Sequence, residues 1–333
     1  MGKRRGTLES LGLNLSTPVP APDSYDLYDS YDCGADGCPL EDGGETVPDM
    51  GATFRRCPRC RVLRLPHENL ADRHVPSDPT GGLSVAMKIL FRMRCYWLNR
   101  QVNELQKKDA PILDMGCGDG QFLAYLKDRG YSNLTGIEPE AGRAANARLR
   151  GLNVPEGLDA LAALDGGGLF SVIFLWHVME HIPAPVTLLR QLTGHLDRNG
   201  TLIISVPNHA SSQTRLFGRW STYPDYGRHL WFHFPGYEDF LAECMAECDV
   251  RVIANFNFEY EIFGWVDTWA SFVFGRRHYV HGTLKKGTGS LTERLSAIAA
   301  AIVLLPLAVP AAIVSLAIGR GSTLNLKLTL KKS

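Results

Sequence analysis

Hydrophobic and polar positions follow a regular alternation between residues 111 and 258. Short runs of leucine and β-branched residues are separated by stretches with the period of a helix. This alternation is typical of a parallel sheet with crossover helices, so it predicts a doubly wound α/β domain. The predicted strands are 111–115, 133–138, a weak one near Asn153, 170–176, 201–206 and 250–258, and the predicted helices are 121–129, 140–150, 185–196 and 237–247.

The residues before this domain follow other patterns. Residues 1–30 carry prolines among Ser, Asp and Tyr without an apolar period, so we predict a disordered tail. Residues 31–70 hold four cysteines, and residues 71–110 link them to the domain. Within this link, residues 83–106 have the period of a basic amphipathic helix, which we expect to pack on the sheet.

Aromatic side chains crowd the region 211–290, well above the chain average of 9%. They could form a lid over a substrate pocket, or they could be ordinary core and interface residues. The pattern does not separate these readings, so we treat the region as a candidate lid and substrate region.

An apolar segment and an alternating tail follow. Residues 295–318 carry no charge and would form a helix of about 36 Å, long enough to cross a bilayer. Pro306 and Pro310 interrupt them, and the alternation over 323–331 predicts a strand with one buried face. If that strand joins the sheet, both ends of the segment lie on one side of a membrane. We therefore expect a membrane-dipping apolar hairpin over 291–318, with a spanning helix and a buried core or oligomer helix as alternatives.

The composition limits the class of protein. Of the 333 residues, 45% are hydrophobic and 21% are charged, which argues against a wholly disordered chain. Lys and Arg together number 35, as do Asp and Glu, so no strongly basic nucleic-acid surface is expected. The 8 cysteines are too sparse for a secreted disulfide scaffold, and the basic first residues lead into no apolar signal. We expect a cytoplasmic protein that binds no nucleic acid.

A glycine-rich turn follows the first strand of the domain. Glycines let the backbone approach a ligand at the carboxyl end of a strand, where doubly wound sheets bind nucleotides. Twenty residues after Gly118, Glu138 ends the next strand and can accept hydrogen bonds from both hydroxyls of a ribose. A dinucleotide fingerprint needs a third glycine at position 121, but Gln121 is there and the glycine is Gly120. The pattern favours an adenosine ligand without a pyrophosphate, namely S-adenosylmethionine.

These motifs resemble those of the class I S-adenosylmethionine-dependent methyltransferases. The similarity lies in LDMGCGDG at 113–120, GIEP at 136–139 and FSVIFLWHVMEHIP at 170–183. The third segment resembles the fourth strand of the ubiquinone-type O-methyltransferases, and the whole resemblance covers roughly residues 110–258. It implies cofactor contacts from Asp114, Gly116, Cys117, Gly118, Gly120, Glu138, Pro139, Trp176 and His177.

The resemblance also implies a fold. The family has a Rossmann-like seven-stranded sheet in the order 3-2-1-4-5-7-6, with strand 7 antiparallel. Residues 111–258 together with 319–333 would then form the methyltransferase core. The alternating tail would be the antiparallel strand inserted beside the sixth.

Histidines are the candidate bases for methyl transfer. Transfer from a sulfonium is an in-line displacement, so the protein supplies alignment, a dry pocket and, for a hydroxyl acceptor, a base. His177 and His181 follow the fourth strand, and His229 lies in a stretch that resembles the acceptor side of the family. We expect His229 or His181 to be the base, although each could be a structural histidine. Glu180 with His181 could hold a divalent ion, a question that the sequence leaves open.

Four cysteines form two pairs in the segment 31–70. Cys33 and Cys38 are separated by four residues, and Cys57 and Cys60 by two, an arrangement that suits tetrahedral zinc in a small structural site. The alternative is a set of unrelated thiols in a flexible segment. Some methyltransferases of the deoxysugar-modifying type carry a similar four-Cys zinc module, and this resemblance favours a sugar acceptor.

Two enzymatic hypotheses follow. In the first, the chain methylates a lipid-like or lipid-linked acceptor at an oxygen atom. The amphiphilic acceptor would enter from the membrane beside the apolar hairpin. In the second, the acceptor is a soluble or nucleotide-linked sugar, and the apolar segment is a core or dimer element. A third hypothesis is a non-catalytic cofactor-binding scaffold. The sequence makes no prediction about the oligomeric state.

Overall fold

The computed structural model describes most of the chain after residue 85 and three short segments before it. The described residues are 41–46, 53–57, 60–65, 85–155, 169–226, 228–253, 259–285 and 290–331. The expected disordered tail at 1–30 and the cysteines Cys33 and Cys38 lie outside them.

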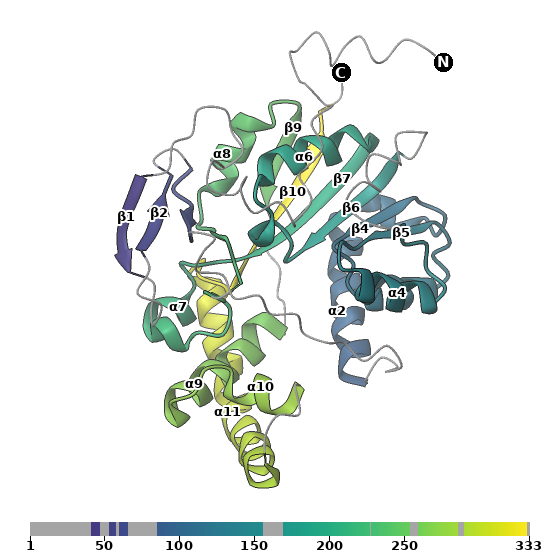
Figure 1. Cartoon of the computed structure of the whole chain (residues 1–333). Helices are drawn as coiled ribbons and strands as arrows, with labels where there is room; N and C mark the ends of the chain where they lie inside the picture. Colours follow the sequence, from purple (N-terminus) through teal and green to yellow (C-terminus); the bar gives the residue numbers. More distant parts are fainter. Residues whose placement is uncertain are drawn as a thin grey trace, which may run out of the picture.

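The main sheet has six strands within the described residues (Figure 1). Their order is β5 (Leu134–Ile137), β4 (Ile112–Met115), β6 (Phe170–Trp176), β7 (Leu196–Pro207), β10 (Thr323–Leu330) and β9 (Cys248–Val252). The first four are parallel, and β10 lies antiparallel between β7 and β9. The alternating tail is therefore an inner strand of the sheet.

The expectation of seven strands is wrong for the described residues. Near Asn153 the chain makes one parallel bridge to Thr135 and no strand. Pro155 follows two residues later and has no N–H to donate to a ladder, which stops the pairing. The expected strand at 250–258 starts earlier, as β9, and residues 254–258 lie outside the described residues.

Helices cover both faces of the sheet because the strand residues alternate between them. On one face, α2 (Val85–Gln101), α3 (Gln121–Lys127) and α4 (Ala141–Leu149) pack with Ile112 and Phe174. On the other face, α6 (Pro185–Gly194) and α8 (Tyr237–Cys244) pack with Leu113 and Met115. The expected amphipathic helix at 83–106 is thus confirmed as α2, which is followed by the short 3-10 helix η3 (Asn103–Gln106).

A second, small sheet lies beside the main domain. It consists of β1 (Glu41–Thr46), β2 (Thr53–Arg56), β3 (Leu63–Arg64) and β8 (Trp231–Phe232) in that order. Phe54 of β2 packs edge-on against Phe232, with ring centroids 5.1 Å apart, and is fully buried. The cysteine-bearing segment is therefore attached to the domain by strand pairing and by an aromatic core.

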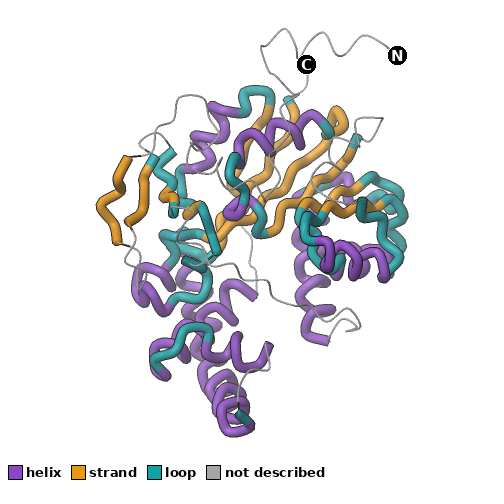
Figure 2. Tube along the Cα trace, viewed as in Figure 1, coloured by secondary structure: helices purple, strands orange, loops and turns teal. Residues whose placement is uncertain are grey.

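A group of helices lies at one end of the molecule, away from the helices that cover the sheet (Figures 1 and 2). We call it the helical unit. It contains the π-helix η7 (Glu259–Phe263), α9 (Gly264–Phe274), α10 (Tyr279–Lys285) and α11 (Leu291–Ala317). The shorter α7 (Ser212–Phe217) and the 3-10 helix η6 (Gly218–Trp220) precede it in the chain, and Phe217 packs on Trp265 of α9. The helical unit has a core of its own, formed by Ile262, Trp265, Val266, Ala270, Tyr279, Val280, Ala297, Ala308 and Ala312.

The expected hairpin within 291–318 is wrong, because α11 is a single helix that contains both prolines. Each proline removes one helical hydrogen bond, at a cost of about 3 kcal/mol in an ordinary helix interior. Pro306 and Pro310 are four residues apart and both exposed, so the disturbed turns lie on the outward side. The opposite side is fixed by contacts with α9, and a capping box at Ser290 and Glu293 closes the first turn.

Candidate active site

The glycine turn joins the carboxyl end of β4 to α3. All three of its alternate glycines have positive φ, with values of 74° at Gly116, 58° at Gly118 and 70° at Gly120. Such angles are unfavourable for residues with a Cβ. A Cβ on Gly120 would also lie 2.5 Å from Leu152, so this glycine lets α3 approach the neighbouring α4 region. Cys117 is buried in the same turn, and burial raises the pKa of its thiol far above the ordinary value.

Two carboxylates lie at the carboxyl ends of neighbouring strands. Glu138 accepts from the backbone N–H of Gly118 at 2.8 Å and from that of Glu140 at 3.0 Å. Asp114 is almost fully buried, and this burial raises its pKa to about 7, with Glu138 adding to the rise and Arg94 opposing it. Pro139, the next predicted cofactor residue, is exposed. The expected carboxylates are therefore brought together at the turn.

Arg94 of α2 reaches this edge of the sheet, which the sequence did not predict. Its guanidinium lies 4.7 Å from the ring of Trp176 and 5.3 Å from that of Phe122. Its charge lowers the pKa of Asp114 against the effect of burial. In the sequence it is one of several arginines in a basic amphipathic helix, and only the packing of α2 singles it out.

The three candidate bases gather around one carboxylate. Glu180 lies in the 3-10 helix η5 (Met179–His181), directly after β6, and is completely buried. His177 Nδ1 lies 3.3 Å from Glu180 Oε1, and His229 Nε2 lies 4.0 Å from the same oxygen. His181 packs on His229 with ring centroids 4.8 Å apart, and its Nδ1 lies 3.0 Å from the carbonyl oxygen of Arg228. Residues far apart in the sequence thus form one polar cluster.

The electrostatics of this cluster favour a neutral His229 beside an ionised Glu180. Burial and, after it, the neighbouring His181 lower the pKa of His229 to about 3. Burial alone would raise the pKa of Glu180, but the interaction with His177 and the nearby His181 and His229 lower it to about 2. The Nδ1 atom of His229 is buried with no hydrogen-bond partner among the described residues. A neutral imidazole with a free nitrogen can accept a proton, and the carboxylate can stabilise the imidazolium that forms.

The same cluster could hold a metal ion. Glu180, His181 and His229 each offer one ligand atom, and these atoms lie within 4.8 Å of one another. Imidazole and carboxylate together suit a first-row divalent metal. The fold thus adds His229 to the pair Glu180 and His181 that the sequence offered for a divalent ion.

Two tyrosines extend the site away from the sheet. His177, a residue with positive φ of 55°, stacks on Tyr260 with ring centroids 4.1 Å apart and an interplanar angle of 13°. Tyr260 in turn lies 4.5 Å from Tyr223. Sequence reasoning placed both tyrosines only within an aromatic region. The other described aromatics of that region lie in the helical unit, in the small sheet or, as Tyr237 and Phe240 do, on α8 in the main core, so the lid stays a prediction.

Cys57 and Cys60 form a tight turn at the end of β2. Cys60 N–H points to Cys57 Sγ at 3.3 Å, and Arg61 N–H donates to Cys57 O at 2.9 Å. Arg61 has a positive φ of 59°. Both cysteines are buried, and neither forms a disulfide. The turn brings the backbone of Cys60 to the thiol of Cys57, and the expected partners Cys33 and Cys38 lie outside the described residues.

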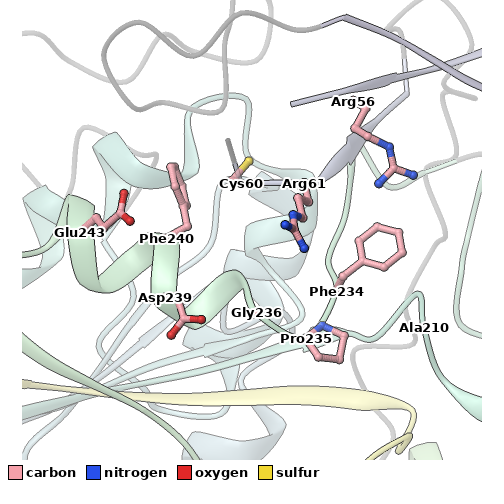
Figure 3. A pocket seen from close by; sticks show the side chains of 10 residues that line it. All are labelled: Arg56, Cys60, Arg61, Ala210, Phe234, Pro235, Gly236, Asp239, Phe240 and Glu243. Carbon is pink, nitrogen blue, oxygen red and sulfur yellow. The ribbon is translucent and has the colours of Figure 1, made fainter. Parts of the chain in front are cut away.

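A cavity of about 470 Å³ lies next to this turn (Figure 3). Arg56 and Arg61 line one side, and Asp239 and Glu243 of α8 line the other. Its lining includes none of the predicted cofactor residues and none of the candidate bases. The cavity is therefore separate from the glycine turn and the histidine cluster.

Comparisons with known proteins agree with the chemistry of the turn. Residues 90–255 match a family model described as a methyltransferase domain. The chain is 28% identical over 122 residues to the ubiquinone biosynthesis O-methyltransferase of Pseudomonas aeruginosa (strain UCBPP-PA14), which covers 35% of this chain and 51% of that protein. It is 26% identical over 198 residues to the tRNA U34 carboxymethyltransferase of Shewanella oneidensis, covering 56% of this chain and 52% of that protein.

A solved structure of the plantazolicin methyltransferase BamL aligns with a TM-score of 0.44 and 15% identity, over 74% of this chain and 84% of that chain. The chain spans about half the length of the curated relatives it matches.

The family match and the glycine turn show that residues 90–255 form a methyltransferase domain of the class I S-adenosylmethionine-dependent type. The turn and the Glu138 carboxylate bonded to it fit S-adenosylmethionine as the cofactor of this domain. The similarity to ubiquinone O-methyltransferases is weak, at 28% identity, and leaves the methyl acceptor open.

Proposed function

We propose that the chain transfers a methyl group from S-adenosylmethionine to an oxygen of a lipid-like or lipid-linked acceptor, as a cytoplasmic protein attached to a membrane surface. The observation that carries this proposal is the distribution of side chains around α11. Small residues face the protein and large aliphatic residues face outward, the reverse of a helix on a water-soluble core.

On α11 the buried side chains are small, and most of the large aliphatic side chains are exposed to solvent. Ala308 and Ala312 are completely buried against the helical unit, whereas Ile302 and Val303 are both 67% exposed. The helix is long and apolar enough to cross a membrane, and only 17% of its most apolar window is buried. Phe272, Val273 and Phe274 at the end of α9 are exposed as well. A bilayer is the solvent in which such a surface is stable.

The site residues fit the cofactor and a hydroxyl acceptor. Glu138 would hold the ribose hydroxyls, and Asp114 and Arg94 would face the ammonium and the carboxylate of the methionine part. S-adenosylmethionine supplies the electrophilic methyl group. His229 would take the proton of the acceptor hydroxyl through its free Nδ1, and Glu180 would stabilise the resulting charge. Tyr223 and Tyr260 would shield this side of the site from water.

The lipid acceptor is tested by tracing a labelled methyl group. Purified protein and methyl-labelled S-adenosylmethionine are added to a membrane-containing extract of its own source, and label is counted in the organic and aqueous phases. We expect label in the organic phase that disappears with Glu138→Ala. Label confined to the aqueous phase would rule out the lipid acceptor.

The alternative is methylation of a soluble or nucleotide-linked sugar. The observation that favours it is the Cys57–Cys60 turn, because a four-Cys zinc module is found in some sugar-modifying methyltransferases. We infer that Cys57 and Cys60 bind a structural zinc ion together with Cys33 and Cys38. The backbone N–H of Cys60 pointing to Cys57 Sγ supports this, since such a contact stabilises a thiolate. Zinc alone does not decide the acceptor, because both hypotheses accommodate it.

A further inference from the structure

Asp267 is a fully buried carboxylate at the centre of the helical unit. Its Oδ1 accepts from the backbone N–H groups of Val280 and His281, in the first turn of α10, at 2.9 Å each. Its Oδ2 accepts from the hydroxyl of Thr222 at 3.0 Å and lies 3.6 Å from His278 Nδ1. One side chain of α9 therefore joins α10 to a segment that lies outside the helical unit.

That segment leads directly to the candidate base. The backbone N–H of Thr222 also points to Thr268 Oγ1 at 3.3 Å, and Arg277 donates to the carbonyl oxygen of Pro224 at 2.9 Å. A few residues later the chain reaches His229. The segment 221–226 is thus attached to the helical unit at two points before it enters the histidine cluster.

Tyr223, the residue after Thr222, is one of the two tyrosines that extend the site away from the sheet. Tyr223 lies between Tyr260 and Gly264, and a Cβ on Gly264 would be 2.5 Å from the Tyr223 ring. Tyr260 is stacked on His177 at the carboxyl end of β6. Because Tyr223 contacts Tyr260 and Tyr260 contacts His177, we expect a shift of Thr222 to move Tyr223 and, through it, Tyr260 and His177.

We propose that Asp267 is a positioning residue for methyl transfer. By holding Thr222, it keeps Tyr223 and Tyr260 in place over His177, and it makes the acceptor side of the site depend on the helical unit. Loss of the carboxylate leaves buried donors unsatisfied, and the segment relaxes to find other partners. The inference rests on the proposed function in one respect, that the acceptor is bound beside His177.

The main test compares two threonines. Thr222→Val removes the hydroxyl that donates to Asp267. Thr283→Val is the matched control, because Thr283 is also fully buried and its hydroxyl is bonded to Arg276, away from the segment 221–226. We expect Thr222→Val to lower the rate of label transfer in the extract assay about tenfold, while the affinity for S-adenosylhomocysteine stays within about twofold. Thr283→Val should retain both the rate of label transfer and the affinity for S-adenosylhomocysteine, although its thermal midpoint should fall about as much as that of Thr222→Val.

A second measurement does not depend on the acceptor. The imidazole resonances of His177, assigned with His177→Gln, report the ring current of the stacked Tyr260. We expect them to shift in Thr222→Val and in Asp267→Asn, and to stay in place in Thr283→Val. Unchanged His177 resonances with normal turnover in Thr222→Val would overturn the proposal, as would equal changes in the control. If the wild-type protein transfers no label, the proposed function fails, and the resonances still decide the role of Asp267.

Discussion

The backbone N–H of Gly118 donates to Glu138 Oε2 at 2.8 Å, which ties the glycine turn after β4 to the carboxylate at the end of β5. The bond holds that carboxylate at the position where doubly wound sheets bind a ribose. Twenty residues of sequence separate the two groups, and the parallel pairing of β4 with β5 brings them together.

Replacing Glu138 tests the ribose contact. Glu138→Ala should weaken binding of S-adenosylhomocysteine about a hundredfold or more, because two hydrogen bonds to a charged acceptor are lost. The affinity of Glu138→Gln for S-adenosylhomocysteine should lie between that of Glu138→Ala and that of the wild type, since one acceptor oxygen remains. Calorimetric titration measures both, and equal affinity of all three proteins would contradict the assignment.

Replacing His229 tests the base. His229→Gln should lower turnover about a hundredfold or more without weakening cofactor binding. Burial lowers the pKa of His229 to about 3, so the neutral base is present throughout pH 5 to 8, and its protonation should not limit turnover there. His233→Gln is the control, because His233 is another buried histidine whose pKa is lowered by burial, but it packs on Tyr237. A turnover that falls with a pKa near 6.5 in the wild type, and no longer does so in His229→Gln, would show that this imidazole titrates normally.

Polar substitutions on α11 test the membrane surface. The pair Ile302→Asn and Val303→Asn should reduce co-sedimentation with anionic lipid vesicles roughly tenfold or more, because each buried aliphatic side chain contributes about 1.5–3 kcal/mol. Leu149→Asn, at a 78% exposed apolar position on α4, should leave it unchanged. If the wild-type protein stays in solution and instead forms a dimer that the α11 pair disrupts, the apolar surface is a protein interface.

Acid should destabilise the fold through three histidines, and two buried carboxyls should oppose part of this effect, because burial raises the pKa of Asp114 and of Glu261 to about 7. Burial lowers the pKa of His209 and of His233 to about 4 and that of His229 to about 3, below the unfolded value near 6.5. Between pH 6.5 and 4 the unfolded chain therefore binds protons that the folded chain does not. Each of these imidazoles should lower the free energy of unfolding by up to about 1.4 kcal/mol per pH unit as the pH falls, and each of the two carboxyls should raise it by up to the same amount, so the net expectation between pH 6.5 and 5 is a fall of about one imidazole's share.

A variant isolates one of these groups. His209 packs against Phe54, Phe232 and Phe234, so His209→Phe should be accommodated and should reduce the slope. Chemical unfolding at several pH values measures the dependence of the free energy of unfolding on pH. The same dependence of stability on pH in His209→Phe and in the wild type would show that His209 is accessible to protons in the folded state.

Metal analysis tests the cysteine module. The purified protein should contain about one zinc ion per chain, and Cys57→Ser should lose it. Cys95→Ser is the control, because Cys95 lies on α2, outside the module. Zinc retained by Cys57→Ser, or absent from the wild type purified without chelator, would contradict the four-cysteine site.

Much of the main domain was predictable from local patterns. Strand β6 appears at the predicted residues, and β4, β5, α3, α4, α6 and α8 appear within a few residues of them. The reason is that a buried parallel strand needs a continuous apolar run, whatever surrounds it. The glycine turn was predictable for a similar reason, since three positive φ angles within five residues require glycine whatever ligand the turn binds.

Other features were decided only by the tertiary structure. Asn153 has the sequence of a weak strand, but Pro155 limits it to one bridge. Prolines 306 and 310 suggested a broken helix, and the contacts of Ala308 and Ala312 with the helical unit keep α11 continuous.

The acceptor side of the site shows the same division. The sequence named His177, His181 and His229 one by one as candidate bases, because histidine exchanges a proton near neutral pH, and it named Glu180 with His181 as a possible metal-binding pair. It gave no sign of Arg94, Tyr260 or Asp267, which are ordinary members of a basic helix and of an apolar, aromatic region. Their roles arise from long-range packing, which places α2 against the sheet and the helical unit against the segment before His229. Local sequence specifies the elements and the cofactor turn, and only the fold specifies which side chains from distant elements meet.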